Sequence, residues 1–143
     1  MSGLFLIAQI AGRTVAIGSD QVESVVDIGE VTPVPRAPSL VLGLAALRSR
    51  VVTVICTRGA LGLKPGRTPA RAVIVLVDGH HYALLVDALD DVSAFALQPL
   101  ANGTALEPKW RGIAIGIVER DGEPVLAIDL AALVPGIVTA VAA

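Results

Sequence analysis

Aromatic residues, cysteine and clusters of basic residues are all scarce in this sequence, and each scarcity excludes a class of protein. Only 3% of the 143 residues are aromatic, the net charge is −2, and the basic residues do not form a cluster in the sequence. Nucleic-acid binding needs cations for the phosphates and usually aromatic rings for the bases, so we expect no nucleic-acid partner. The single cysteine, Cys56, excludes an internal disulfide and indicates a reducing compartment.

The sequence also lacks an uncharged run long enough to cross a membrane as a helix. The uncharged apolar run that follows Asp129 falls short of about 18 residues and is interrupted by Pro135 and Gly136. The apolar run near the N-terminus has no preceding basic residue, which a signal peptide would have, and it fits a first strand better. We therefore predict a cytoplasmic protein that does not insert into a membrane.

Aliphatic residues are what the sequence has in excess, since 54% of the chain is apolar. A chain of this length buries roughly two-thirds of its unfolded surface, so its core needs neither a metal nor a disulfide. Val and Ile favour pleated structure, and nine prolines and fourteen glycines interrupt the apolar runs. This composition predicts many short strands joined by turns.

About ten apolar runs follow one another at regular spacing, with turn residues between them. Two-residue turn signals at Ala11-Gly12, Asp78-Gly79 and Asp121-Gly122 predict three β-hairpins. The expected strands cover residues 4–10, 13–18, 22–28, 44–47, 50–55, 71–77, 80–87, 90–100, 111–119 and 124–130. Such a pattern predicts an all-β fold of small barrels or a sandwich.

A Gly- and Pro-rich segment, residues 59–70, divides these strands into two groups of five. We therefore expect two lobes, approximately residues 1–66 and 67–143, joined at this segment. Short helical segments are expected near residues 39–44 and at 129–137, the second with Asp129 as its N-cap. Residues 101–110 are expected to form a loop.

No residue pattern indicates a metal site. His80 and His81 are adjacent on an expected strand, so they point to opposite faces and cannot share one metal ion, and we interpret them as solvated turn histidines. Asp87, Asp90 and Asp91 form the densest acidic group, but no calcium-loop pattern surrounds them. We expect a solvated strand end there.

Cys56, the only cysteine in the sequence, is a candidate nucleophile. It lies in a Val/Ile run, which favours a buried structural thiol. One alternative for the function nevertheless stays open, a small β-barrel enzyme or ligand-binding domain that uses Cys56 or the region from Asp87 to Asp91. Fast reaction of the thiol in the folded protein would favour that alternative.

Three arginines, Arg48, Arg50 and Arg58, interrupt the apolar segment 43–63. Arg48 and Arg50 lie near the end of an expected hairpin and project on the same face if the strand period holds. They are either solubilising charges of the kind that sheet edges use, or part of a protein-binding surface. Arginine suits such a surface because its planar fork pairs with carboxylates while its stem packs on apolar groups.

The order of these features resembles the CheW-like family, the coupling proteins of bacterial chemotaxis. The resemblance covers nearly the whole chain and rests on an N-terminal strand pair followed by three stretches. These stretches are QVESVVDIGEVTPVPRAPSLVLGLAALRSRVVTVI, RAVIVLVDGHHYALLVDALDDV and RGIAIGIVERDGEPVLAIDLAAL. Gly43 and the turn from Ala46 to Ser49 stand where the family has a Gly and an Asn-Leu-Arg-Gly turn.

The resemblance implies one CheW-like domain over residues 1–143, folded as two packed five-stranded SH3-like barrels with short helical segments. It implies a scaffold without enzymatic activity or cofactor. Its implied partners are the regulatory domain of the histidine kinase CheA and the cytoplasmic tip of chemoreceptors. Such a protein is cytoplasmic and is recruited to receptor arrays at the membrane.

The resemblance also nominates protein-binding residues. Arg48 matches the turn arginine that is tied to assembly in the family, and Val22 lies on the strand that helps to shape the receptor-facing surface. The full expected set is Arg48, Val22, Glu23, Leu47, Ser49 and Arg50.

The polar signature departs from the family pattern in several places, including Thr53 and Cys56-Thr57, which stand where the family usually has a Pro and an Asp-Leu pair. Ala46 and Ser49 replace the Asn and Gly of the turn, and the family's strand Glu aligns with Ser24, one place after Glu23. On a strand, one place means the opposite face. A second alternative is therefore a diverged adaptor that binds the kinase but not receptors.

Overall fold

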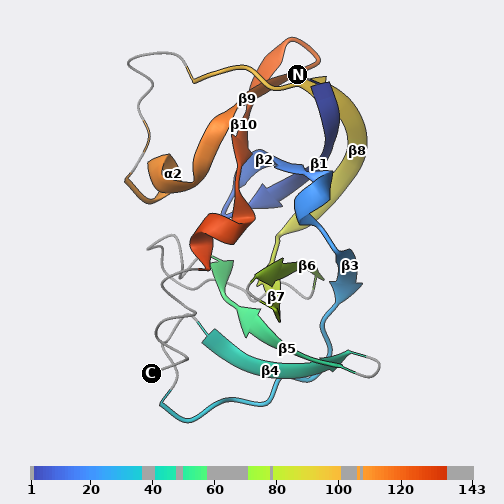
Figure 1. Cartoon of the computed structure of the whole chain (residues 1–143), viewed down its shortest axis with the longest axis vertical. Helices are drawn as coiled ribbons and strands as arrows, with labels where there is room; N and C mark the ends of the chain where they lie inside the picture. Colours follow the sequence, from blue (N-terminus) through green and yellow to red (C-terminus); the bar gives the residue numbers. More distant parts are fainter. Residues whose placement is uncertain are drawn as a thin grey trace.

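The computed structural model describes residues 2–36, 41–47, 50–57, 71–77, 79–100, 106 and 108–134. Two five-stranded sheets lie one above the other along the long axis of the molecule (Figure 1). The first, barrel 1, has the order β8(Ala88–Ala96)-β1(Ser2–Ile10)-β2(Arg13–Gly18)-β10(Glu123–Ile128)-β9(Ala114–Arg120). The second, barrel 2, has the order β3(Ser24–Asp27)-β6(Arg71–Val77)-β7(His80–Leu85)-β5(Arg50–Ile55)-β4(Val41–Leu47).

Each sheet curls until its two edges meet at one pair of residues. In barrel 1, Gln98 and Ile117 exchange two backbone hydrogen bonds of 2.8 Å. In barrel 2, Thr32 and Leu44 do the same, also at 2.8 Å. The predicted all-β fold of two five-stranded barrels is therefore confirmed.

The two barrels share one topology although the sequence shows no internal repeat. Each contains two hairpins and one parallel pairing that joins them, β5 with β7 in barrel 2 and β10 with β2 in barrel 1. Val54 lies opposite Ala83 in one parallel pairing, and Ala127 lies opposite Ala16 in the other. Equivalent positions can therefore be assigned from the register alone.

The expected lobes, residues 1–66 and 67–143, do not coincide with the two sheets, so this expected boundary is wrong. Barrel 1 takes the first two and the last three strands, while barrel 2 takes the five strands between them. The chain passes from barrel 1 to barrel 2 through the 3₁₀ turn η1(Ser19–Gln21) and returns to pair β8 with β1. The lobes are decided by the pairing of distant strands, which composition does not reveal. The expected junction, residues 59–70, lies outside the described part of the chain.

Most central strands bury both faces, which explains why the apolar runs are nearly continuous. In β6, for example, Ala72 and Ile74 face the interior of barrel 2, while Val73 and Val75 join a cluster shared by both barrels. Alanines make room for the small barrel interiors. They are Ala16 and Ala127 in barrel 1 and Ala45, Ala72 and Ala83 in barrel 2.

Three expectations for the helical segments have different outcomes. Val41 begins β4, so the helical turn expected near residues 39–44 is wrong over its described part. The loop expected at 101–110 is wrong at its end, where helix α2(Pro108–Ile113) forms and delays the next strand to Ala114. Asp129 is confirmed as the N-cap of a 3₁₀ helix, η2(Leu130–Leu133), because its carboxylate accepts a 3.1 Å hydrogen bond from Ala131 N.

Candidate functional site

A groove of about 520 Å³ opens on barrel 2, between β3 and the end of the β4–β5 hairpin. The start of β3 forms one wall, and Leu47 and Arg50 form the other. Val52 and Ile74, which are 1% and 2% exposed, close its base. The lining residues are Glu23, Ser24, Val25, Val26, Leu47, Arg50, Val52 and Ile74.

The groove exists because β3 is short. Its equivalent in barrel 1, β8, has nine residues, whereas β3 has four and pairs with β6 alone among the described strands. The bridge between Thr32 and Leu44 closes the barrel further along, which leaves the first part of this seam open. We call the open part the β3 groove.

Three polar side chains meet at one end of the β3 groove. Arg50 Nη1 donates a 2.6 Å hydrogen bond to Glu23 Oε1 and another to His81 Nε2. His81 Nε2 also lies 3.0 Å from Glu23 Oε2. The side chains are 50% exposed for Arg50, 36% for Glu23 and 23% for His81, so the cluster sits at the surface.

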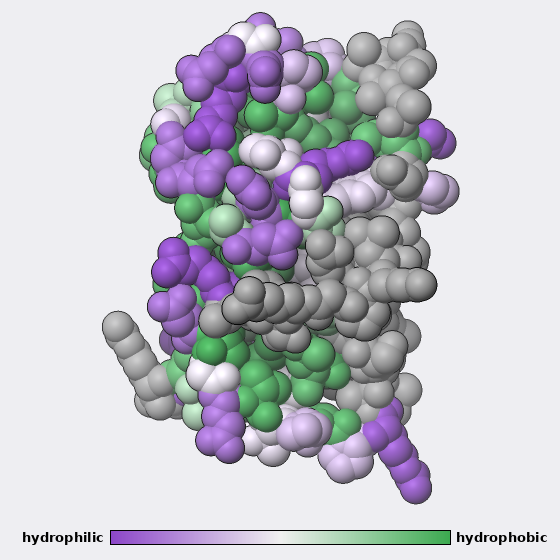
Figure 2. Space-filling model, turned by 180° about the vertical axis from the view of Figure 1, so that it is seen from behind, coloured by the Kyte–Doolittle hydropathy of each residue, from purple (hydrophilic) through white to green (hydrophobic). Residues whose placement is uncertain are grey.

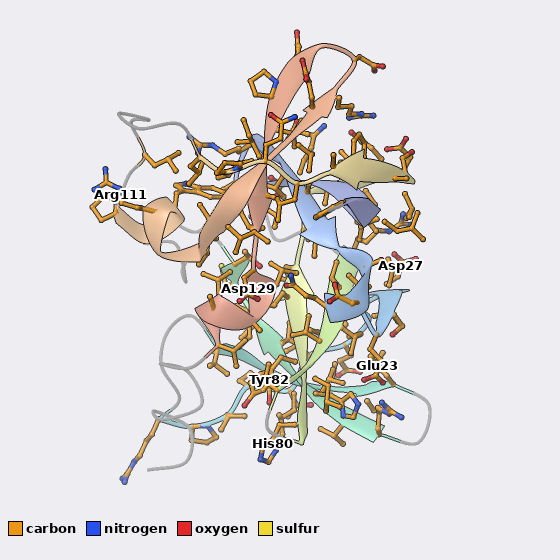
Figure 3. All side chains as sticks on the ribbon, turned by 45° about the horizontal axis from the view of Figure 1, so that its top comes forward. Glu23, Asp27, His80, Tyr82, Arg111 and Asp129 are labelled. Atoms are coloured by element: carbon orange, nitrogen blue, oxygen red, sulfur yellow. The ribbon has the colours of Figure 1, made fainter. Side chains whose placement is uncertain are left out.

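A second ion pair lies at the other end of β3. Arg71 Nε donates a 3.1 Å hydrogen bond to Asp27 Oδ1. Figure 3 labels Glu23 and Asp27, which lie on the same side of the molecule near the two ends of this strand. Charge therefore marks both ends of β3, and aliphatic side chains lie between them.

The structure brings together three of the six expected protein-binding residues. Glu23, Leu47 and Arg50 line the β3 groove, although Glu23 is more than twenty residues away from the other two in the sequence. Val22 is adjacent in sequence but is partly buried against the cluster shared by the two barrels. Arg48 and Ser49 lie outside the described residues.

His81 is the residue that the sequence interpretation placed wrongly. It is not a solvated turn histidine, because its ring contacts Arg50 of β5 and Glu23, the residue that immediately precedes β3. Its neighbour His80 is exposed, and Figure 3 shows it away from Glu23. Consecutive side chains of β7 point to opposite faces of the sheet, which explains why only one of the two histidines makes these contacts. Which residues His81 contacts follows only from the strand order of barrel 2.

The region from Asp87 to Asp91 is engaged within the chain. Asp87 Oδ2 accepts a 3.1 Å hydrogen bond from Gly12 N. Asp90 and Asp91 both contact Arg120, at 3.2 and 3.6 Å. All three carboxylates are exposed, as expected for a solvated strand end, and each also has a partner within the chain. In the described ranges, no three His, Cys, Asp or Glu side chains gather in a way that could hold a metal ion.

Cys56 follows β5 and is partly buried rather than fully enclosed. The next residue, Thr57, is 3% exposed and donates a 2.6 Å hydrogen bond to Leu85 O, which fixes the chain as it leaves the sheet. The expectation of a buried thiol is therefore met only in part, and the rate of thiol modification in the folded protein measures how accessible Cys56 is.

Aliphatic side chains are also exposed outside the groove. Seen from behind, apolar surface (green) emerges on both barrels between polar patches (Figure 2). Val51 is 61% exposed, Val92 is 55% exposed and Leu4 is 56% exposed. Exposed aliphatic side chains of this size are candidates for protein contacts. Over the part of the chain that the structure describes, no helix is long and apolar enough to span a membrane.

Comparison with known proteins finds one family model, the CheW-like domain, which matches residues 4–137. The chemotaxis protein CheW of Rhizobium meliloti is 28% identical over 107 residues, covering 73% of this chain and 69% of the relative. The probable chemotaxis protein CheW of Rhizobium etli is 33% identical over 108 residues, covering 71% and 68%. The crystal structure of the scaffolding protein TtCheW from Thermoanaerobacter tengcongensis is similar in fold, with a TM-score of 0.79, 22% identity and 94% of each chain covered.

Proposed function

Because the chain belongs to the CheW-like domain family, we propose that it is a non-enzymatic scaffold that couples chemoreceptors to the histidine kinase CheA. The observation that carries this proposal is the extent of the family match. It runs from β1 past η2 and so includes every strand of both barrels. The match to the family model thus covers the whole fold rather than one motif, and two relatives named as CheW chemotaxis proteins align with 73% and 71% of the chain.

The chemistry of the described surface supports a contact function. The β3 groove combines a half-exposed arginine with aliphatic walls, and exposed Val51 and Leu44 lie on the outer face of the β4–β5 hairpin. Arginine flanked by apolar groups is a combination that often dominates the energy of protein interfaces. The proposed partners are the regulatory domain of the kinase and the helical tip of a receptor, which packs an amphipathic face on apolar surface.

In this proposal the protein works in the cytoplasm and is held at receptor arrays by its partners. The described residues place Asp87, Asp90 and Asp91 in contacts within the chain, which disfavours the ligand-binding alternative that relies on them. The alternative that relies on Cys56 is tested separately, by measuring how fast its thiol reacts in the folded protein.

Sedimentation of purified components tests the proposal. The protein is mixed, at about 20 μM, with the kinase and the receptor fragment encoded by neighbouring genes, a concentration that detects dissociation constants in the micromolar range. We expect a complex of all three, and no complex with either protein would refute the scaffold function.

Pairwise mixtures separate the two forms of adaptor. A scaffold that couples the partners sediments with the kinase alone and with the receptor fragment alone. Binding to the kinase only would replace the proposal with the diverged adaptor that does not contact receptors.

A further inference from the structure

The two barrels each carry an arginine at the end of a hairpin, beside the seam, but the two arginines are satisfied differently. Arg120, the last residue of β9, contacts two carboxylates of β8, Asp90 through Nη1 and Asp91 through Nη2. Arg50, the first residue of β5, has one carboxylate partner within the described part of the chain, Glu23. Among the described residues, every contact of Arg50 uses Nη1, so Nε and Nη2 are open to a partner.

The register shows where the second carboxylate is missing. Asp91 lies opposite Ile7 in barrel 1, and Ser24 lies opposite Ile74 in barrel 2. Ile7 and Ile74 are equivalent, because each lies opposite the alanine at the centre of its barrel's parallel pairing. Ser24 therefore occupies the place of Asp91, and an acidic residue precedes both. This equivalence applies to the carboxylate positions on β8 and β3. It does not extend to the arginines, because Arg120 lies on the first strand of its hairpin and Arg50 on the second strand of its hairpin.

From this difference we propose that the β3 groove binds a segment of a partner protein that carries aliphatic side chains and one carboxylate. The carboxylate pairs with Nε and Nη2 of Arg50 and supplies the charge that Asp91 supplies to Arg120. A guanidinium presents two parallel N–H donors on such an edge, which fits a carboxylate in bidentate geometry. Val25, Val26 and Leu47 provide the apolar walls.

The cluster at the groove prepares Arg50 for this contact. Glu23, just before β3, and His81 of β7 hold Nη1, so part of the side-chain entropy of Arg50 is lost before the partner binds. Half exposure of Arg50 leaves the remaining nitrogens accessible. The inference rests on the proposed function only for the identity of the partner, because the chemistry of the segment follows from the groove.

A peptide titration tests the chemistry without any assumption about the partner. The arginine Nε–H signals of the ¹⁵N-labelled protein are followed by NMR while acetyl-Leu-Glu-Leu-amide is added, with acetyl-Leu-Gln-Leu-amide as the neutral control. We expect a saturable shift of the Arg50 signal with the acidic peptide, at least about threefold larger than with the neutral one. The Arg71 signal serves as the internal reference, because Arg71 is equally exposed and its Nε already donates to Asp27.

Two substitutions at Ser24 make the test specific. Ser24→Asp installs the carboxylate that barrel 1 already has, and we expect it to fill the open edge of Arg50 and remove the peptide-dependent shift. Ser24→Asn, which adds a similar volume without charge, leaves the shift in place. Equal shifts for Arg50 and Arg71, no shift of Arg50, or a shift that survives Ser24→Asp would each overturn the inference.

The same variants separate this inference from the proposed function. In the sedimentation assay, Arg50→Gln and Ser24→Asp are expected to weaken the partner that occupies the groove by about three- to tenfold, whereas Arg71→Gln leaves its affinity unchanged. A wild-type complex that is insensitive to both substitutions would refute the inference while the scaffold function stands. A peptide response without any kinase or receptor complex would refute the scaffold function and keep the inference.

Discussion

Gly43 and Gly116 occupy the same place in the two barrels. Each immediately precedes the residue that bridges the seam, and their φ angles are +147° and +157°. A Cβ on Gly43 would overlap the carbonyl oxygen of Thr32, and a Cβ on Gly116 would overlap that of Gln98. Barrel closure therefore depends on the absence of a side chain at one position in each sheet.

Replacement of either glycine by alanine should destabilise the fold. We expect Gly43→Ala and Gly116→Ala each to cost about 2–4 kcal/mol, because the new Cβ meets backbone atoms and φ is unfavourable for an L residue. Thermal unfolding followed by circular dichroism measures the effect as a fall of roughly 5–15 °C in Tm. Gly29→Ala is the control, since nothing lies within 4 Å of its added Cβ, and unchanged Tm values for the other two variants would contradict this account of closure.

The shared cluster between the barrels should make the molecule unfold as one unit. Ile128 is fully buried in this cluster together with side chains of both sheets. We expect Ile128→Ala to cost about 2–5 kcal/mol and to lower the stability of both barrels together. Urea unfolding is measured by circular dichroism and by the fluorescence of Trp110, the only tryptophan, which belongs to the same cluster.

Coincident transitions by the two probes are the expected result for both wild type and Ile128→Ala. Val51→Ala, at a position that is 61% exposed, is the matched control and should change the stability by less than about 0.5 kcal/mol. Two separated transitions would show instead that each barrel folds on its own core.

Local patterns predict the individual strands well because turn chemistry is local. The strands at 13–18 and 71–77 are predicted to the residue, and Asp121 and Gly122 have the positive φ values that a tight hairpin turn requires. The lobes are not predicted, because β8 returns to pair with β1 across most of the chain. Composition cannot reveal which distant strands share a sheet.

The sequence predicts the candidate site only in part, because local patterns do not show which distant strands meet. Glu23, Leu47 and Arg50 belong to stretches that carry the family resemblance, and all three line the β3 groove. His81 was missed because its partners lie 58 and 31 residues away and meet it only through the strand order of barrel 2. The shortness of β3, which opens the groove, likewise becomes visible only beside its counterpart β8.

The alanines inside the barrels should resist enlargement. Ala83 is fully buried in the interior of barrel 2, between strands that carry Val54 and Ile74. We expect Ala83→Leu to cost about 1–3 kcal/mol, because the added atoms force neighbours out of their rotamers. The free energy of unfolding in urea measures this cost, and Ala46→Leu, at an exposed position, is the control. Equal stability of the two variants would mean that the barrel interior has spare volume.

Arg48 remains the residue that the family resemblance connects most directly with assembly. We expect Arg48→Glu to weaken the complex with the kinase or the receptor fragment by about tenfold, because the reversed charge repels a surface that suits arginine. Sedimentation at several concentrations gives the affinity, and thermal unfolding should show a Tm within about 2 °C of wild type if Arg48 serves binding rather than folding. Arg111→Glu is the control, since Arg111 is exposed on α2, beside β9 and β10 of barrel 1 (Figure 1), and its Nη2 donates only a 3.2 Å hydrogen bond to Leu106 O among the described contacts. A large fall in Tm would assign Arg48 a structural role, and an unchanged affinity would remove it from the binding surface.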